Sequence, residues 1–117
     1  MDSLKGLNDK HRRFVEDRDW QKHQSPKNLV IALMGEVGEV AEHFQWLTPE
    51  ESWNLEDDKK HAVGEELADV LIYLTSIAAE LDIDIIAAAH EKCEANARKY
   101  PAEQFKGNNK RPHERKD

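Results

Sequence analysis

Helical periodicity is the feature of this 117-residue sequence that most restricts its fold. Apolar residues recur every three or four positions over long stretches, and no alternating strand pattern of useful length interrupts them. Leu4, Leu7, His11 and Phe14 follow this spacing and predict a first amphipathic helix. We therefore expect an all-α chain with one folded domain over residues 1–101.

Capping residues indicate where a second helix and a short helical turn begin. Ser25 is a suitable N-cap, and Pro26 after it fits the first position of a helix. This second helix is expected to extend to about Trp46. Thr48 and Glu51 are three residues apart and form a capping box, which predicts a short helical turn in the following connection.

A third helix is expected over residues 56–81, with an apolar seam at spacings of four and three: Val63, Leu67, Val70, Leu74, Ile77 and Leu81. Asp82 is placed to cap a fourth helix, which Pro101 must end. The polar residues 102–117 are expected to form a mobile tail. Together the helices predict a four-helix bundle.

Apolar residues outside this seam predict that the third helix packs on more than one side: Ile72, Ala78 and Ala79. A bundle of about 100 ordered residues has little interior in which to bury a helix all round. The chain is therefore expected to associate into a dimer or a larger assembly.

The net charge of −7 is unevenly distributed along the chain. Residues 106–117 carry a surplus of three positive charges, so residues 1–105 carry a net charge of −10. Such an acidic body repels nucleic-acid phosphates and attracts metal cations. The single cysteine, Cys93, excludes an intrachain disulfide and a cysteine-ligated zinc site. Since neither a membrane span nor the apolar core of a signal peptide is present, we expect a cytoplasmic protein without a membrane partner.

Four carboxylates occupy unusual positions on the second and third helices. At 100° per residue, Glu36 lies in the middle of the apolar stripe of its helix, and Glu39 lies at its edge. Glu66, Asp69 and Tyr73 form one line on the third helix. Two such acidic pairs can face one another across a groove, where four oxygen ligands suit Mg²⁺ or Mn²⁺. The alternative is a solvated surface, where glutamate pairs on helices are common.

Two segments carry these carboxylates: residues 35–39 read GEVGE, and residues 65–73 read EELADVLIY. They resemble the divided E-x-x-E and E-x-x-D signature of the MazG-like all-α nucleoside triphosphate pyrophosphohydrolases, and within that family the dCTP pyrophosphatase branch. Three further short segments match in the same order: Arg18 to Trp20, Phe44 to Trp46, and Arg98 to Pro101. The resemblance implies a bundle of the MazG-like type and favours a dimer of dimers, that is, a homotetramer.

The resemblance also implies which residues form the site. It assigns the magnesium ions and the catalysis to the four carboxylates: Glu36, Glu39, Glu66 and Asp69. It assigns nucleotide binding to six residues: His11, Trp20 and Trp46 around the base, Tyr73 against the deoxyribose, and Lys92 and Asn96 at the phosphates. Many members have a second glutamate at the position of Gly35, which leaves the number of ions open. By residue type alone, a core position is the favoured interpretation of His11 and of both tryptophans.

The activity that the resemblance implies is Mg²⁺-dependent hydrolysis of a deoxynucleoside triphosphate to its monophosphate and pyrophosphate. The expected substrate is dCTP or a modified pyrimidine nucleotide, and the expected role is cleansing of the nucleotide pool. Divalent cations would attract a triphosphate that four bare carboxylates would repel. The base would be a carboxylate or a metal-bound hydroxide. The alternative is a non-catalytic helical adaptor whose acidic groove binds partners or cations.

Overall fold

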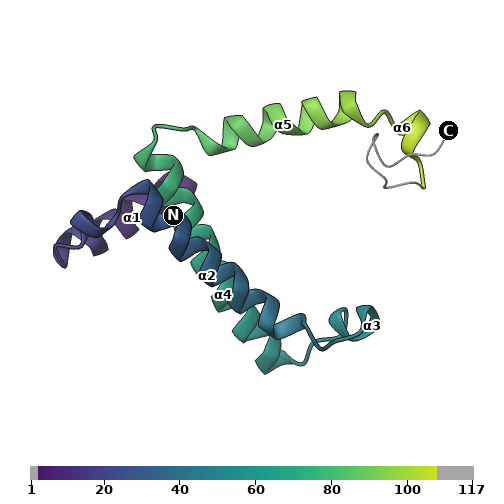
Figure 1. Ribbon diagram of the computed structural model, residues 1–117, viewed down its shortest axis with the longest axis horizontal. Coiled ribbons are helices and arrows are strands. Elements are labelled where there is room, and N and C mark those ends of the chain that lie inside the picture. The colour runs from purple at the N-terminus through teal and green to yellow at the C-terminus, as the bar shows by residue number, and fades with distance from the viewer. Residues whose placement is uncertain (1–2, 108–117) are drawn as a thin grey trace. The chain divides into compact units, whose positions relative to one another are not determined.

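Helices account for all the regular secondary structure that the computed structural model contains over residues 3–107, the part of the chain that it describes (Figure 1). The expected all-α class is therefore confirmed. The elements follow in the order α1 (Leu4–Asp17), the 3-10 turn η1 (Gln21–His23), α2 (Pro26–Phe44), α3 (Pro49–Ser52), α4 (Asp57–Glu80), α5 (Ile85–Lys99) and α6 (Ala102–Phe105). None of these helices is long and apolar enough to cross a membrane.

The chain forms two compact units, Met1–Ile83 and Asp84–Asp117. The domain predicted over residues 1–101 therefore extends across both units. Three of the four long helices that the sequence predicts, α1, α2 and α4, belong to the first unit. The fourth, α5, belongs to the second unit together with α6.

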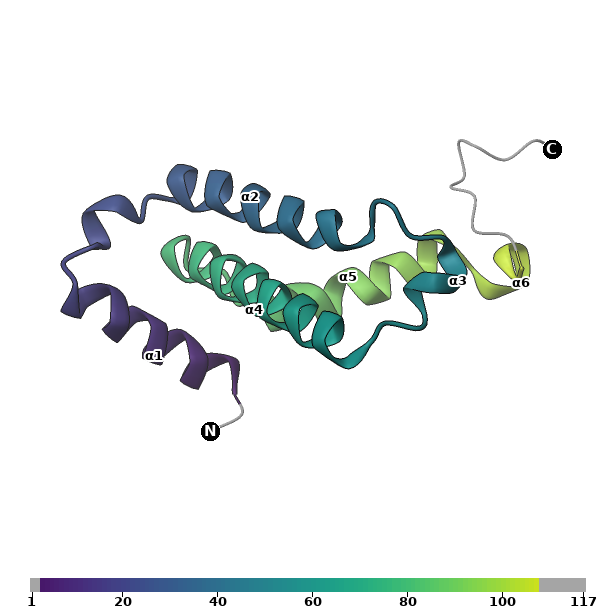
Figure 2. The same cartoon turned by 90° about the horizontal axis from the view of Figure 1, so that it is seen from below.

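In the first unit, α4 is the central element. Helix α2 packs along α4, and α1 packs against α4 as well (Figure 2). The most deeply buried apolar side chains lie on these three helices: Val15 on α1, Leu29 on α2, and Val63 and Ala78 on α4. The core of this unit is thin, and it is built around α4.

Local capping explains where these helices begin. Ser25 Oγ accepts a hydrogen bond from the Asn28 backbone N–H at 3.2 Å, and Pro26 is the first residue of α2. At α3, Thr48 Oγ1 accepts from the Glu51 N–H at 3.1 Å, and Glu51 Oε1 accepts from the Thr48 N–H at 2.8 Å. Both predicted helix starts, including the capping box, are confirmed.

The predicted cap of α5 is wrong by two residues. Asp82 has a left-handed backbone, with φ of 54°, and lies in the turn that ends α4. In this turn the Ile83 N–H donates to the Ala78 carbonyl at 2.8 Å, which satisfies a carbonyl that the helix leaves open. The N-cap of α5 is Asp84, whose Oδ1 accepts from the Ala87 N–H at 3.0 Å.

The apolar seam predicted for α4 is only partly buried. Leu67, Leu74 and Leu81 are exposed. The buried and half-buried stripe of α4 is instead Val63, Glu66, Val70, Tyr73 and Ile77. It keeps the alternating spacing of three and four, but two of its positions hold a carboxylate and a phenol. A prediction based on hydrophobicity alone chooses the leucines as the buried residues. It therefore places the buried stripe on a neighbouring side of the helix.

The second unit begins with α5, which ends at Lys99 just before Tyr100 and Pro101, as the sequence predicts. Part of the predicted tail, residues 102–117, is helical, because Ala102–Phe105 forms α6. The Phe105 ring meets the Tyr100 ring edge to face, with 5.1 Å between their centroids. The rest of that predicted tail, residues 108–117, lies outside the described residues.

Candidate active site

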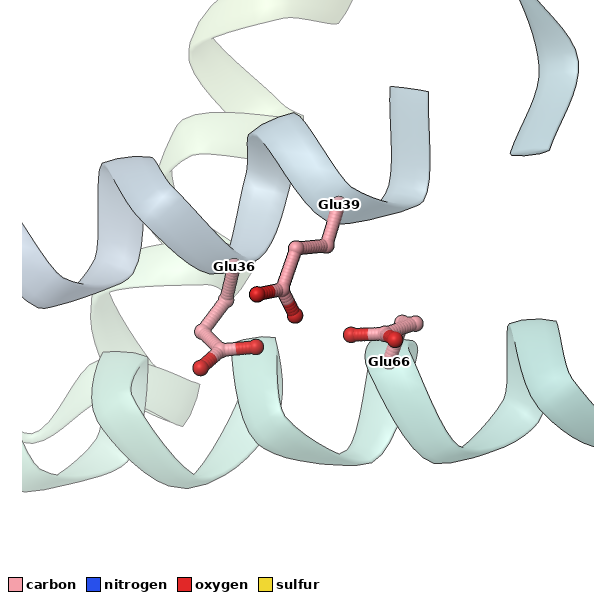
Figure 3. Close-up of side chains that lie close together, drawn as sticks. All are labelled: Glu36, Glu39 and Glu66. Carbon is pink, nitrogen blue, oxygen red and sulfur yellow. The ribbon is translucent and has the colours of Figure 1, made fainter. Parts of the chain in front are cut away.

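Three glutamates meet where α2 packs along α4. Figure 3 shows Glu36 and Glu39 reaching from α2 toward α4, and Glu66 on α4 beside them. Each offers one carboxylate oxygen, and these three oxygens lie within 4.8 Å of one another. We call these three residues the glutamate cluster. The sequence prediction that the two acidic pairs approach one another across the helices is met for three of its four members.

The positions of the cluster follow from helix geometry. On α2, Leu29 is buried, and Ala32, Glu36, Val40 and His43 continue its stripe at half-buried positions. Steps of three and four residues return to the same side of a helix. The stripe that buries Leu29 therefore also carries the Glu36 carboxylate into the helix contact.

The carboxylates change one another's acidity. A hydrogen bond with the Glu39 side chain, then burial, then the charges of Glu39, Glu36 and Asp69 raise the pKa of Glu66 to about 7. Burial raises the pKa of Glu36, and its hydrogen bond with Glu39 and the charges of Glu39 and Asp69 add to this effect. Neighbouring like charges disfavour ionisation, so the cluster holds protons that isolated carboxyls would release.

A divalent cation fits this donor set. Glu36 Oε2 is buried and has no hydrogen-bond partner, although buried polar atoms normally have one. Hard cations such as Mg²⁺ and Mn²⁺ prefer carboxylate oxygens, and a bound cation would also remove the repulsion that raises both pKa values. The residues that could hold it are Glu36, Glu39 and Glu66.

Asp69, the fourth predicted ligand, lies one helical turn after Glu66 and outside the glutamate cluster. Its side chain is exposed, yet its charge contributes to the raised pKa values of Glu36 and Glu66. Asp69 also lines a cavity of about 520 Å³ between α1 and α4, together with nine other residues: Leu7, Lys10, His11, Phe14, Val15, Trp20, Gln24, Ile72 and Tyr73. Asp69 therefore connects the cluster to this cavity.

Aromatic rings form one wall of the cavity. The His11 ring stacks on Phe14 at 5.8 Å and 15°, and Trp20 meets Phe14 edge to face at 5.8 Å and 75°. The Arg18 guanidinium covers the Phe14 ring at 3.7 Å from its centroid. Burial lowers the pKa of His11 and so favours its neutral imidazole, which offers one donor and one acceptor.

A tight turn after α1 places Trp20 at this wall. Asp19 has a left-handed backbone, with φ of 54°, and its N–H donates to the Glu16 carbonyl at 3.0 Å. The Trp20 N–H then donates to the carbonyl of buried Val15, also at 3.0 Å. This pair of hydrogen bonds reverses the chain at the helix end. Trp20 is 47% exposed, so it is a cavity wall and not a core residue.

Trp46, another predicted binding residue of the first unit, does not line this cavity. Trp46 follows the C-terminal end of α2, is 87% exposed and is absent from the cavity lining, whereas Trp20 precedes the N-terminal end of that helix. Lys92 and Asn96 lie one turn apart on α5, in the second unit.

Three residues near the site were not singled out from the sequence. Lys10 and Phe14 line the cavity, and their spacing of four residues places both on one face of α1. His43 lies beside Glu66, seven residues after Glu36 on the same stripe of α2. Helical spacing was therefore a usable signal for all three. In the sequence, Phe14 was used only to mark the apolar face of the first helix.

The fold and the site define an all-α protein with a carboxylate centre between two helices and an aromatic cavity beside it. Residues 31–114 match the MazG-like family, and the chain belongs to this family.

Relatives of known name are similar over most of this chain. It is 42% identical over 104 residues to dCTP pyrophosphatase 1 of Homo sapiens, covering 86% of this chain and 60% of the relative. It is 39% identical over 109 residues to dCTP pyrophosphatase 1 of Bos taurus, covering 90% of this chain and 63% of the relative. The chain thus spans about 60% of the length of these curated relatives.

A solved structure has the same fold. The crystal structure of a pyrophosphatase from Archaeoglobus fulgidus DSM 4304 superposes with a TM-score of 0.79 at 40% sequence identity. The match covers 84% of this chain and 92% of the archaeal one.

Proposed function

We propose that this chain is a Mg²⁺-dependent nucleoside triphosphate pyrophosphohydrolase that converts a deoxynucleoside triphosphate to its monophosphate and pyrophosphate. We assign it dCTP or a modified pyrimidine nucleotide as substrate, with Mn²⁺ as a substitute metal and the cytoplasmic nucleotide pool as its place of action. The observation that carries the proposal is the position of Asp69, which links the glutamate cluster to the aromatic cavity. The names of the relatives and of the archaeal structure support the same activity.

Different residues of the chain would bind the base and the phosphates. The cavity volume of about 520 Å³ accommodates a pyrimidine nucleoside, with Trp20 and Phe14 as apolar walls and neutral His11 as the hydrogen-bonding group. Tyr73 in the same lining would lie against the deoxyribose. Asp69 would then stand between the nucleoside and the glutamate cluster, where the phosphates must come.

The predicted ligands of the metal would be Glu36, Glu39, Glu66 and Asp69. When bound, Mg²⁺ neutralises the triphosphate, polarises its phosphoryl oxygens and acidifies a water molecule. Attack by water at the α-phosphorus breaks its bond to the oxygen bridging to the β-phosphorus, which leaves monophosphate and pyrophosphate. Lys92 and Asn96 of α5 are assigned to the phosphates by the family resemblance.

We propose further that the enzyme works as a homo-oligomer, a dimer of dimers. Large apolar side chains are exposed on two helices of the first unit: Ile31, Met34 and Val37 on α2, and Leu67, Leu71 and Leu74 on α4. Large exposed apolar side chains gathered on one face are typical of an association face. The 19 residues of α2 span about 28 Å, which separates Trp46 from the cavity of its own chain. We therefore assign Trp46 to the base site of a neighbouring copy.

The experiment that tests the proposal is pyrophosphate release from a panel of standard and modified triphosphates in Mg²⁺. We expect a pyrimidine deoxynucleotide to be the best substrate, and ribonucleotides to be poorer because Tyr73 lines the sugar position. Glu66→Gln is expected to abolish release. Glu65→Gln, one residue away and exposed, is the matched control and is expected to retain it. Absence of release from every triphosphate would favour the adaptor instead.

A further inference from the structure

One basic side chain lies against the glutamate cluster. His43 is on α2, one turn after Glu39, and its Nε2 lies 4.0 Å from Oε1 of Glu66 on α4. Both side chains are largely buried, with 22% of His43 and 24% of Glu66 exposed. Among the described residues, His43 is the one Lys, Arg or His with a nitrogen within 4.0 Å of a cluster carboxylate.

We propose that His43 is a positioning residue that holds Glu66 in the orientation needed to bind the cation. This inference rests on the proposed function, in which the glutamate cluster binds Mg²⁺. An imidazole N–H donates to a carboxylate oxygen in both the neutral and the charged form. If His43 holds Oε1, the second oxygen of Glu66 is left for the metal ion. Groups that hold ligating carboxylates in this way act on affinity without touching the metal.

The surroundings of Glu66 explain why such a partner is needed. Glu66 shares a hydrogen bond with Glu39 across the helix contact. A carboxyl oxygen engaged with another carboxyl is not free to bind a cation. His43 lies at Glu66 from the next turn of α2 and competes for the same side chain. The 4.0 Å separation exceeds a hydrogen bond, so one of the two side chains would move closer when the N–H donates.

The chain provides a matched control in a second histidine–glutamate pair. His61 Nε2 lies 2.8 Å from Glu65 Oε1 on α4, but both side chains are exposed, at 79% and 69%. Glu65 is outside the glutamate cluster. The same substitution at His61 therefore removes an imidazole–carboxylate contact of shorter distance without touching the proposed metal site.

The test measures Mn²⁺ binding to the full chain without nucleotide, by electron paramagnetic resonance of the free ion or by calorimetry. We expect His43→Leu to weaken Mn²⁺ binding by about 10- to 100-fold, the usual effect of losing a group that holds a ligand. His43→Gln keeps an N–H at a similar reach and is expected to recover most of the affinity. His61→Leu should bind as the unaltered protein does. Circular dichroism and Tm establish that each variant is folded, and His43→Ala replaces His43→Leu if the latter unfolds.

Three results would overturn the inference. Unaltered Mn²⁺ affinity in folded His43→Leu or His43→Ala would show that Glu66 needs no such partner, and would leave the proposed function intact. Equal losses in His43→Leu and His43→Gln would make the imidazole a direct ligand and not a positioning group. Absence of Mn²⁺ and Mg²⁺ binding in the unaltered protein would instead overturn the proposed function, on which the inference depends.

Discussion

Glu36 occupies a position that helix packing ordinarily gives to an apolar side chain. The stripe of α2 that carries Glu36 begins with Leu29, which is 1% exposed. One carboxylate oxygen of Glu36 is buried and has no hydrogen-bond partner. Burying a carboxylate without compensation costs several kcal/mol, and such groups respond by holding a proton or binding a cation. The raised pKa of Glu36 is the first response, and the proposed metal ion is the second.

Removing one carboxylate charge should therefore separate catalysis from folding. We expect Glu39→Gln and Asp69→Asn to lower kcat by about 100-fold or more, because each removes a charge used in transition-state stabilisation. Helix content should be unchanged, since Glu39 and Asp69 are exposed. Steady-state pyrophosphate release and circular dichroism on the same samples test this.

Glu42→Gln is the control for these variants, because Glu42 is an exposed residue of α2 outside the glutamate cluster. It should retain full activity. If Glu39→Gln and Asp69→Asn instead gain stability and keep the activity of the unaltered protein, the carboxylates are only unfavourable charges and not ligands. Full activity in excess EDTA would lead to the same conclusion.

The raised pKa of Glu66 predicts how metal binding depends on pH. Its folded-state pKa of about 7 exceeds the ordinary 4.5, so the folded metal-free protein keeps a proton there that metal binding must displace. Affinity for Mg²⁺ should rise as pH increases from about 6 to 8, with proton release that fades above pH 7. Without metal, the contribution of Glu66 to stability is greatest below pH 4.5 and falls as pH rises toward 7.

Calorimetry in two buffers of different ionisation enthalpy measures these protons directly. Glu65→Gln should release them as the unaltered protein does, because Glu65 is exposed and outside the cluster. Equal Mg²⁺ affinity at pH 6 and pH 8 would contradict this assignment of the bound proton.

At the scale of elements, α1 has a double role. It buries Val15 against the rest of its unit, and its other residues form the cavity wall: His11, Phe14 and, through the following turn, Trp20. Because α1 contributes little to the core, substitutions of its residues in the cavity wall should have only a small effect on stability. Recognition of the base is therefore expected to depend on α1, and phosphate chemistry on α2 and α4.

The Trp20→Ala variant tests whether base recognition depends on α1 and the turn that follows it. The indole is 47% exposed and forms a flat wall, so its loss should raise KM for the preferred nucleotide by tenfold or more, equivalent to about 1.4 kcal/mol. Mn²⁺ affinity should not change. Trp53→Ala removes an equally large but 88% exposed indole next to α3, and serves as the control.

A large fall in Tm with an unchanged KM for dCTP would show that Trp20 is a structural residue. Measuring KM and Tm on the same preparations separates these two interpretations.

The helix starts and the side of each helix on which the glutamates lie could be predicted from the sequence, because local chemistry determines them. Ser25 and Thr48 mark helix starts through hydrogen bonds within three residues, and the spacing of Glu36, Glu39 and Glu66 gives their side of each helix. These predictions are confirmed by the structure. Local periodicity needs no knowledge of the partner helix, and this is why it succeeds.

Other features were missed because they depend on the geometry of a turn or on a contact between helices. Asp82 and Asp84 are both acceptable caps, and only the turn closed by Ile83 on Ala78 decides between them. The sequence could not indicate a role for His43, because that role depends on its proximity to Glu66, which lies on another helix. The roles of the individual site residues stay predictions.

At the scale of the whole molecule, exposed apolar surface is the dominant feature of the first unit. Met34 on α2 is 68% exposed and Leu67 on α4 is 52% exposed, both on long helices. Where such side chains form a contiguous patch, the patch marks an association site. Association would bury these side chains and enlarge a core that is thin within one chain.

We expect light scattering at micromolar concentration to give a mass of several times 13.5 kDa, and four times that mass for the proposed tetramer. Met34→Glu and Leu67→Glu should lower this mass, because each places a charge in the apolar association face. Lys60→Glu introduces the same residue at an exposed polar position of α4 and should not lower the mass.

In these smaller species, KM for the nucleotide should also rise, because Trp46 of a neighbouring copy would be lost from the base site. A 13.5 kDa particle in the unaltered protein would refute both the assembly and this role of Trp46.

If the unpartnered oxygen of Glu36 binds the proposed cation, the stability of the fold also depends on the concentration of that cation. A ligand that binds only the folded chain stabilises it by about 2.7 kcal/mol when present at one hundred times its Kd. Magnesium would then be a structural component of the α2–α4 contact as well as a reagent. Removal of magnesium would then lower the free energy of unfolding of the chain as well as its activity.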